Sequence, residues 1–195
     1  MSAPGPRGTS QERGRRRRAR LIEGVTHVLR TGGLQAVSAR SVADAAEVPL
    51  AAVTYYFASL EELIAETLTE MLHQWVEQVR RTTLLARAHP EKADLARWVT
   101  QAMLPPGGTG AIQAHYELLV ACGRRAAFSA VLARGRADLD AALAELIAAV
   151  LSGGARPPSP QLVLAVLDGA VVSALSEGAP VDTTVQARLD ELLRA

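Results

Sequence analysis

The chain has 195 residues, of which 49% are hydrophobic and only 4% aromatic, and its net charge is +1. This length can bury a substantial core and can hold one domain or two small ones. Few stretches alternate with period two, so we expect an all-α protein. A single cysteine, Cys122, excludes an intramolecular disulfide.

No targeting or membrane segment is expected. The basic N-terminus has no apolar stretch behind it, which argues against a secretory signal. The longest apolar run, Leu162 to Leu175, is shorter than a membrane span and contains Asp168. We therefore expect a cytoplasmic protein.

The two ends of the chain differ in charge. Residues 1–57 carry nine arginines and four acidic residues, which gives +5, and the remainder carries −4. A basic N-terminal region followed by an acidic remainder is typical of a nucleic-acid-binding protein with a separate second module.

The first predicted element is a disordered tail over residues 1–12, which are rich in Pro, Gly, Ser and Arg. A helix is expected over about 13–31, with an apolar face at helical spacing, and Gly32 with Gly33 should end it. That face consists of Leu21, Val25, Val28 and Leu29.

Two short helices should follow. Ser38 is a good N-cap for a helix over about 39–46, and Pro49 can begin another that runs to about Phe57. Val42 and Ala46 lie one turn apart on one face of the first of these helices. Together they predict a helix-turn-helix, a unit that places its second helix in the major groove of DNA. Sequence-specific DNA binding is thus the expected function.

The run Val48 to Phe57, followed by Ser59 to Leu63, resembles the signature of TetR-family transcriptional regulators. The resemblance covers about residues 15–70 and implies a short recognition helix that ends in a tyrosine–phenylalanine pair. The chain departs from the family pattern at three places, which are Glu47 in the turn, Pro49-Leu50 and Leu60. Glu47 stands where the family often has glycine, which predicts a left-handed backbone at a cost of about 1 kcal/mol.

Contacts with DNA should divide into phosphate and base contacts. The candidate phosphate contacts are Arg15, Arg16, Arg17, Arg18, Arg40 and Ser41. The alternative interpretation of the arginine run is a solvated tail. Base contacts should come from the outward face of the recognition helix, namely Leu50, Ala51, Thr54 and Tyr55. Tyr56 fits contact with the DNA backbone and packing inside the protein equally well.

Ser59 and Glu62 form a predicted capping box for a long helix over about 60–87. Further helices are expected near 92–103, 110–122, 124–151, 159–177 and 182–194. The predicted domains are a tail over 1–12, a helix-turn-helix DNA-binding domain over 13–58, and a helical effector-binding and dimerisation domain over 59–195.

A single short recognition helix reads few base pairs, so the chain should form a homodimer. The helices near 159–177 and 182–194 are the best candidates, because the first is apolar over more than one face. Its candidate interface residues are Leu162, Val163, Val166, Leu167, Ala170, Val171, Ala174 and Leu175. The alternative is an ordinary buried helix within one subunit.

The family resemblance also implies a pocket for a small-molecule effector among the central helices. Candidate ligand contacts are side chains that are large enough to pack on an organic molecule or carry a group that can hydrogen-bond to it. They are Trp75, Trp98, Met103, His115, Tyr116 and Phe128. For each of them, packing in the core is the alternative. The four histidines are too scattered for a metal site, and no cofactor or metal is expected. Cys122 stands near Arg124 and Arg125, which leaves a redox sensor and a plain buried thiol as interpretations.

Together with the helix-turn-helix, the family resemblance implies a transcriptional repressor that a small organic ligand releases from a palindromic DNA operator. The sequence contains no Ser/His/Asp spacing, metal cluster or phosphate-binding glycine loop, so we do not expect an enzyme. The alternative is a helical interaction protein whose basic tail binds DNA without sequence preference.

Overall fold

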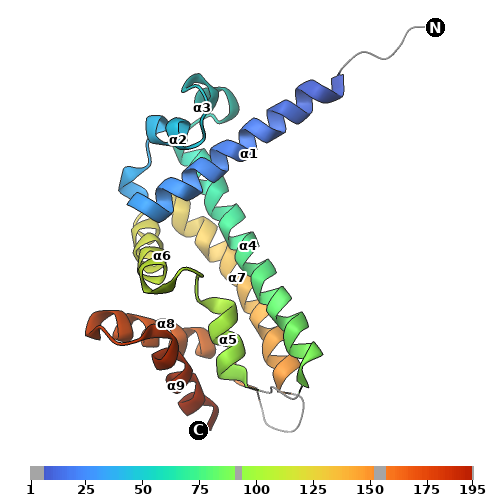
Figure 1. Ribbon diagram of the computed structural model, residues 1–195, viewed down its shortest axis with the longest axis vertical. Coiled ribbons are helices and arrows are strands. Elements are labelled where there is room, and N and C mark those ends of the chain that lie inside the picture. Colours follow the sequence, from blue (N-terminus) through green and yellow to red (C-terminus); the bar gives the residue numbers. More distant parts are fainter. Residues whose placement is uncertain (1–6, 91–93, 152–156, 195) are drawn as a thin grey trace, which may run out of the picture. The chain divides into compact units, whose positions relative to one another are not determined.

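The described part of the chain is helical (Figure 1). The computed structural model describes residues 7–90, 94–151 and 157–194. The helices are α1 (Arg7–Gly32), η1 (Leu34–Ala36), α2 (Ala39–Ala45), α3 (Ala51–Tyr56), α4 (Leu60–Ala88), α5 (Leu95–Met103), α6 (Gly108–Gly123), α7 (Ala126–Val150), α8 (Pro160–Glu177) and α9 (Val181–Arg194). No strand occurs among the described residues, which confirms the predicted all-α class.

Several helix starts differ from the predictions by two or more residues, and two of them lie in the DNA-binding region. α1 begins at Arg7 rather than residue 13, so part of the segment expected to be disordered is helical, while residues 1–6 lie outside the described ones. Arginine is a good helix former, and the Glu12–Arg16 pair one turn apart supports the helix. α3 begins at Ala51, two residues after the predicted Pro49.

The described residues pack as two compact units. The first combines residues up to 71 with 117–131, and the second combines 72–116 with the residues from 132 on. α4, α6 and α7 each pass from one unit into the other without a break.

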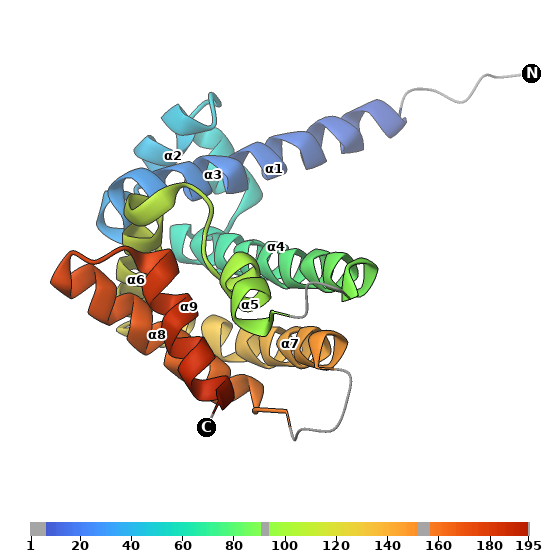
Figure 2. The same ribbon diagram turned by 60° about the horizontal axis from the view of Figure 1, so that its bottom comes forward.

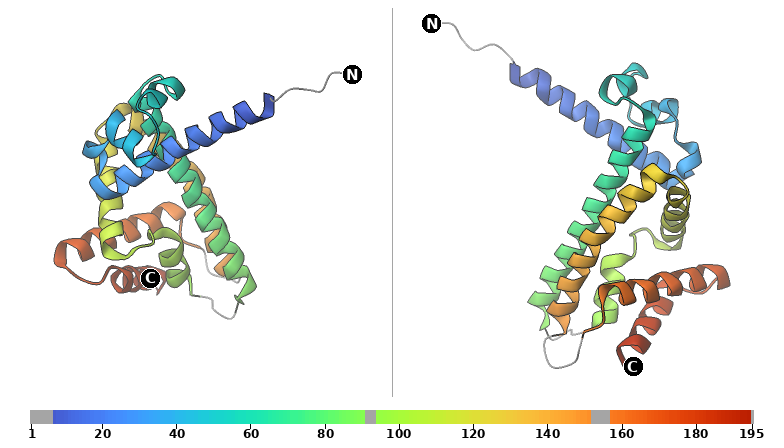
Figure 3. Two further views of the ribbon diagram at one scale, coloured as in Figure 1. Left: turned by 45° about the horizontal axis from the view of Figure 1, so that its top comes forward. Right: turned by 180° about the vertical axis from the view of Figure 1, so that it is seen from behind.

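The first unit contains the predicted DNA-binding helices, and the first turns of α1 extend beyond α2 and α3 (Figure 3). Its core includes the predicted inner face of α1, together with Val42, Val53 and Phe57. Gly24 allows α1 to cross α2 closely, because a Cβ at this position would lie 2.9 Å from the Val42 carbonyl oxygen.

In the second unit, α9 packs against both α8 and α5 (Figure 2). The core of this unit also takes buried side chains from the later turns of α4 and from α7. α8 begins at the Ser159 cap and ends at Gly178, whose left-handed conformation turns the chain towards α9. By length and composition alone, this 18-residue helix could cross a membrane. In the structure, this helix packs against α9.

Candidate DNA-binding surface and effector site

Reciprocal hydrogen bonds close the start of α2. The Ser41 amide donates to Ser38 Oγ at 3.0 Å, and the Ser38 amide donates to Ser41 Oγ at 2.9 Å. The predicted N-cap is therefore confirmed. The Ser41 hydroxyl, predicted to hold a phosphate, already donates to the Ala36 carbonyl at 2.8 Å, whereas Arg40 is exposed.

Glu47 forms the turn between α2 and α3 and has φ 52°. It is the one non-glycine residue with positive φ in the described part of the chain, so the predicted left-handed conformation is confirmed. Its exposed carboxylate accepts a hydrogen bond from Arg20 at 3.2 Å. This pair links the turn to α1.

The two faces of α3 separate as predicted. Val53 and Phe57 are buried, while Leu50, Ala51, Thr54 and Tyr55 are exposed, Tyr55 to 80%. Their role in base contacts remains a prediction, but the structure leaves this surface free of the first unit's core.

Tyr56 packs inside the first unit. It is half-buried, and its hydroxyl lies 3.9 Å from the position that a Cβ would take at Gly14 on α1. Tyr55 meets the Tyr56 ring edge to face, with 4.8 Å between the centroids. Of the two interpretations left open for Tyr56, packing is the one that the contacts support.

The arginine run divides between solvent and protein. Arg15, Arg16 and Arg17 are exposed, and Arg16 pairs with Glu12 on the same helix. Arg18 instead forms two hydrogen bonds with the Glu66 carboxylate and lies over the Phe57 ring, 4.8 Å from its centroid. The structure thus gives Arg18 a partner within the protein, because its guanidinium is held by Glu66 on α4, and its contact with phosphate stays a prediction. Arg18 lies three residues before Leu21 and thus on the inward side of α1.

Three of the six predicted ligand contacts gather in the second unit. The Trp75 and His115 rings meet edge to face at 4.7 Å, and the His115 and Tyr116 rings do so at 5.7 Å. All three side chains are half-buried. Trp98 and Met103 belong to the hydrophobic core around α5, and Phe128 is buried in the first unit. These last three are therefore core residues in this structure, because apolar packing takes up their surface.

Sequence reasoning missed Asp168 as a member of the aromatic cluster. The Tyr116 hydroxyl donates to Asp168 Oδ1 at 2.8 Å, which joins α6 to α8. Burial, and then the Asp168 charge and hydrogen bond, raise the pKa of Tyr116 above its ordinary value, so the hydroxyl keeps its proton. The sequence did contain a signal for this role, because Asp168 is the one acidic residue in the apolar run from Leu162 to Leu175.

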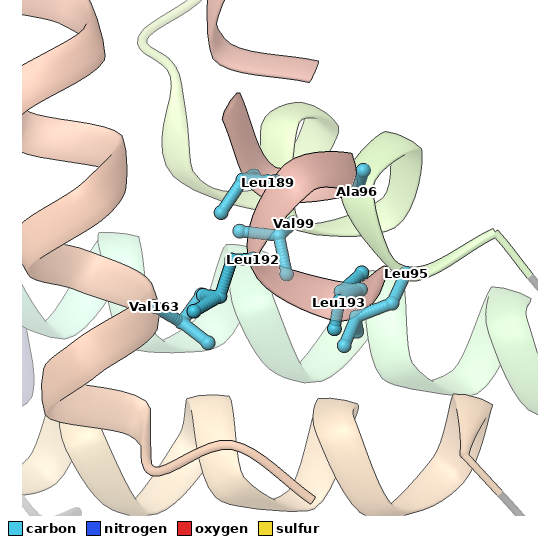
Figure 4. Close-up of a pocket in the computed structure, with 7 residues that line it drawn as sticks. All are labelled: Leu95, Ala96, Val99, Val163, Leu189, Leu192 and Leu193. Atoms are coloured by element: carbon cyan, nitrogen blue, oxygen red, sulfur yellow. The ribbon is translucent and has the colours of Figure 1, made fainter. Parts of the chain in front are cut away.

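A small apolar depression lies elsewhere in the second unit (Figure 4). Side chains of α5, α8 and α9 line it, namely Leu95, Ala96, Val99, Val163, Leu189, Leu192 and Leu193. It encloses about 160 Å³ including open solvent. Sites for drug-sized ligands measure roughly 300–1,000 Å³ and contain placed polar groups, so this depression is not a suitable effector site.

The predicted dimer stripe on α8 lies only partly at the surface. Five of its residues are buried in the core of their own unit, namely Val163, Leu167, Ala170, Val171 and Ala174. These five residues pack in that core, where α9 lies against α8, so they are not exposed to a second subunit in this structure. Leu162, Val166 and Leu175 retain exposed surface, and Val172, which the sequence analysis did not select, is 56% exposed.

Cys122 is fully buried, and burial raises the pKa of its thiol, an effect that Arg125 opposes. This environment favours the plain buried thiol over the redox sensor. Among the described residues, no group of three or more His, Cys, Asp or Glu side chains is arranged to hold a metal ion.

Comparison with known proteins agrees with these features. The family model described as "Tetracyclin repressor-like, C-terminal domain" matches residues 90–195. Among solved structures, the multidrug binding protein EbrR in complex with proflavin is 29% identical, covers 90% of this chain and 99% of its own, and has a TM-score of 0.63. EbrR has also been solved with imidazole, malachite green and ethidium.

Two further solved structures are similar. A TetR-family member from Streptomyces coelicolor A3 is 29% identical over 90% of this chain and 97% of its own, with a TM-score of 0.63. A transcriptional regulator from Rhodococcus sp. Rha1 is 26% identical over 93% and 96%, with a TM-score of 0.60. No curated protein matches the sequence. With the family model spanning more than half of the sequence, the chain belongs to the TetR family of DNA-binding transcriptional regulators.

Proposed function

We propose that this regulator is a repressor that binds a palindromic operator as a homodimer and leaves it when an aromatic small molecule binds. The observation that carries the proposal is the solvent-exposed face of α3, whose opposite face is anchored in the core by Val53 and Phe57. A helix held in this way can enter a major groove without losing its own packing.

Exposed cations in the same unit as α3 support binding to the DNA backbone. Arg15 and Arg17 extend along α1, and Arg40 lies in the first turn of α2. Such contacts give affinity and position, while the exposed face of α3 gives sequence preference. That face offers one hydroxyl from Thr54, one from Tyr55 and otherwise apolar surface, so part of the preference would come from DNA shape.

The exposed face of α8 supports dimerisation. Leu162, Ala165, Gly169 and Val172 follow one another on it at spacings of three and four residues. Two such faces can pack across a two-fold axis and place two α3 helices on the two halves of a palindrome.

The cluster of Trp75, His115 and Tyr116 supports an aromatic effector. Half-buried rings offer apolar area together with polar groups. EbrR, which shares the fold, has been solved with the planar dyes proflavin and ethidium. Because α4 is continuous from the first unit into the second, an effector that prefers one arrangement of the two units would shift the population away from DNA binding. We also infer that the regulator acts in the cytoplasm and without enzymatic activity.

Selection of bound fragments from a random DNA pool tests the proposal, and a recovered palindrome is the expected result. Tyr55→Ala should weaken binding to that palindrome by roughly 1–3 kcal/mol, because Tyr55 presents its ring and hydroxyl to the groove. Tyr55→Phe, which keeps the ring, is the matched control for the hydroxyl. Binding that is equal for all DNA sequences would favour a helical interaction protein with a basic arm.

A further inference from the structure

Asp168 is an unusual carboxylate within the second unit. It lies half-buried on α8 and accepts a hydrogen bond from the neutral Tyr116 hydroxyl. None of the ion pairs found between described residues involves Asp168. A half-buried carboxylate loses part of its hydration, and a neutral hydroxyl compensates for this loss less well than a cation does.

Asp140, in the same unit, shows the more usual arrangement. Its carboxylate accepts from Arg136 Nε at 3.1 Å and from Gln161 Nε2 at 2.8 Å. Arg136 is close enough to affect the Tyr116 hydroxyl electrostatically, but its guanidinium is bound to Asp140. Asp168 is therefore left with a neutral donor, although a cation lies nearby.

Aromatic rings adjoin this carboxylate. Tyr116 contacts Asp168 directly, His115 packs against Tyr116, and Trp75 packs against His115. Aromatic faces attract cations, and an aromatic cation can stack on rings while it pairs with a carboxylate. The cluster thus combines the two kinds of contact that a planar organic cation requires.

We propose that Asp168 is the anionic subsite of the effector site and selects aromatic effectors that carry a positive charge. The Tyr116 hydroxyl occupies this subsite until such an effector replaces it. This inference rests on the proposed function, because it names the chemistry of the effector that the aromatic cluster would bind.

Replacement of the hydroxyl also gives the effector a route to regulation. The Tyr116–Asp168 hydrogen bond joins α6 to α8, and α6 continues from Tyr116 into Glu117, which belongs to the first unit. A cation that pairs with the Asp168 carboxylate breaks the Tyr116–Asp168 hydrogen bond, and it does so only in the effector-bound state. Such a difference between states is what a ligand needs to shift a conformational equilibrium.

The test measures binding of two dyes to the full-length protein by fluorescence at mildly alkaline pH. Proflavin is cationic there, whereas acridine has the same ring system and is uncharged. The wild type should prefer proflavin. Asp168→Asn should lower proflavin affinity by roughly tenfold or more, as expected when one partner of a half-buried charge pair is neutralised, and leave acridine affinity within about twofold.

Two further variants separate the roles. Tyr116→Phe should bind proflavin at least as tightly as the wild type, because the carboxylate no longer has to lose its hydroxyl partner. Asp138→Asn, which removes an exposed carboxylate from α7 in the same unit, is the matched control and should change neither affinity.

Several outcomes would overturn the inference. Equal affinity of the wild type for both dyes, or an equal loss of both in Asp168→Asn, would show that Asp168 does not select charge. A loss of proflavin binding in Tyr116→Phe would show that the hydroxyl belongs to the bound state. If the wild type bound neither dye, the inference would fall together with the aromatic effector of the proposed function.

Discussion

Glu47 adopts a left-handed conformation in the turn of the helix-turn-helix, with φ 52°. A residue with a Cβ has a cost of about 1–2 kcal/mol in this region, and glycine avoids it. The Arg20–Glu47 pair does not offset this cost, since both side chains are substantially exposed and such pairs contribute about 0–1 kcal/mol. The strain is therefore intrinsic to the residue.

This strain predicts that Glu47→Gly is more stable than Glu47→Ala by about 1 kcal/mol, because both variants lose the Arg20 pair and only alanine keeps the strain. At Asp44, an exposed position in the last turn of α2, the order should be reversed, because glycine is less favourable than alanine in a helix. Urea unfolding of the four variants measures both differences. The same order at both positions would contradict the interpretation.

Single residues also show where sequence reasoning stopped. The capping serines, the outward face of α3 and the conformation of Glu47 follow from local rules and were predicted. The roles of Arg18 and Asp168 depend on partners that are 48 and 52 residues away in the sequence. No periodicity or spacing contains that information, so Arg18 was assigned to DNA and Asp168 was overlooked.

At the scale of elements, α1 has two functions along its length. Its inner positions pack on α2, and Arg18 connects it to Glu66 on α4 and to Phe57 after α3. Its exposed positions, among them Arg17, point to solvent and carry the positive charge. Substitution of Arg18 should therefore change the stability of the protein, whereas substitution of Arg17 should change its affinity for DNA.

Arg18→Gln should lower the free energy of unfolding by about 1–2 kcal/mol, because it removes a charge-assisted pair and leaves a half-buried Glu66 without its partner. Arg17→Gln should leave stability within about 0.5 kcal/mol. It should instead reduce the slope of log affinity for DNA against log salt concentration by about 0.9, the value for one lost phosphate contact. Thermal unfolding and binding titrations at several salt concentrations separate the two. Equal effects of both variants on stability would contradict the assignment.

The helical class and the number and order of the main helices were predictable because helix caps and glycine or proline breaks are local signals. The division into two units was not, since α4, α6 and α7 each contribute to both. Likewise, the sequence shows that α8 is apolar over more than one face. It does not show which of these faces packs against α9 and which remains exposed. Leu167 and Val171 lie in the core, while Val172, next to them in sequence, lies at the surface.

At the scale of the whole molecule, this exposed face predicts the oligomeric state. Val172→Glu places a charge where two α8 helices would meet, so it should turn the dimer into a monomer, while the fold remains because Val172 is 56% exposed. Operator affinity should then fall steeply, since each recognition helix binds its half-site alone.

Leu84→Glu is the matched control, because Leu84 is 64% exposed in the same unit but on α4. It makes the same change in charge and should leave the dimer intact. Sedimentation analysis measures the mass of each variant, and circular dichroism verifies its helicity. If Val172→Glu remained a dimer with unchanged operator affinity, α8 would be an ordinary helix of one subunit, and the two copies of α3 would have to be joined through another surface.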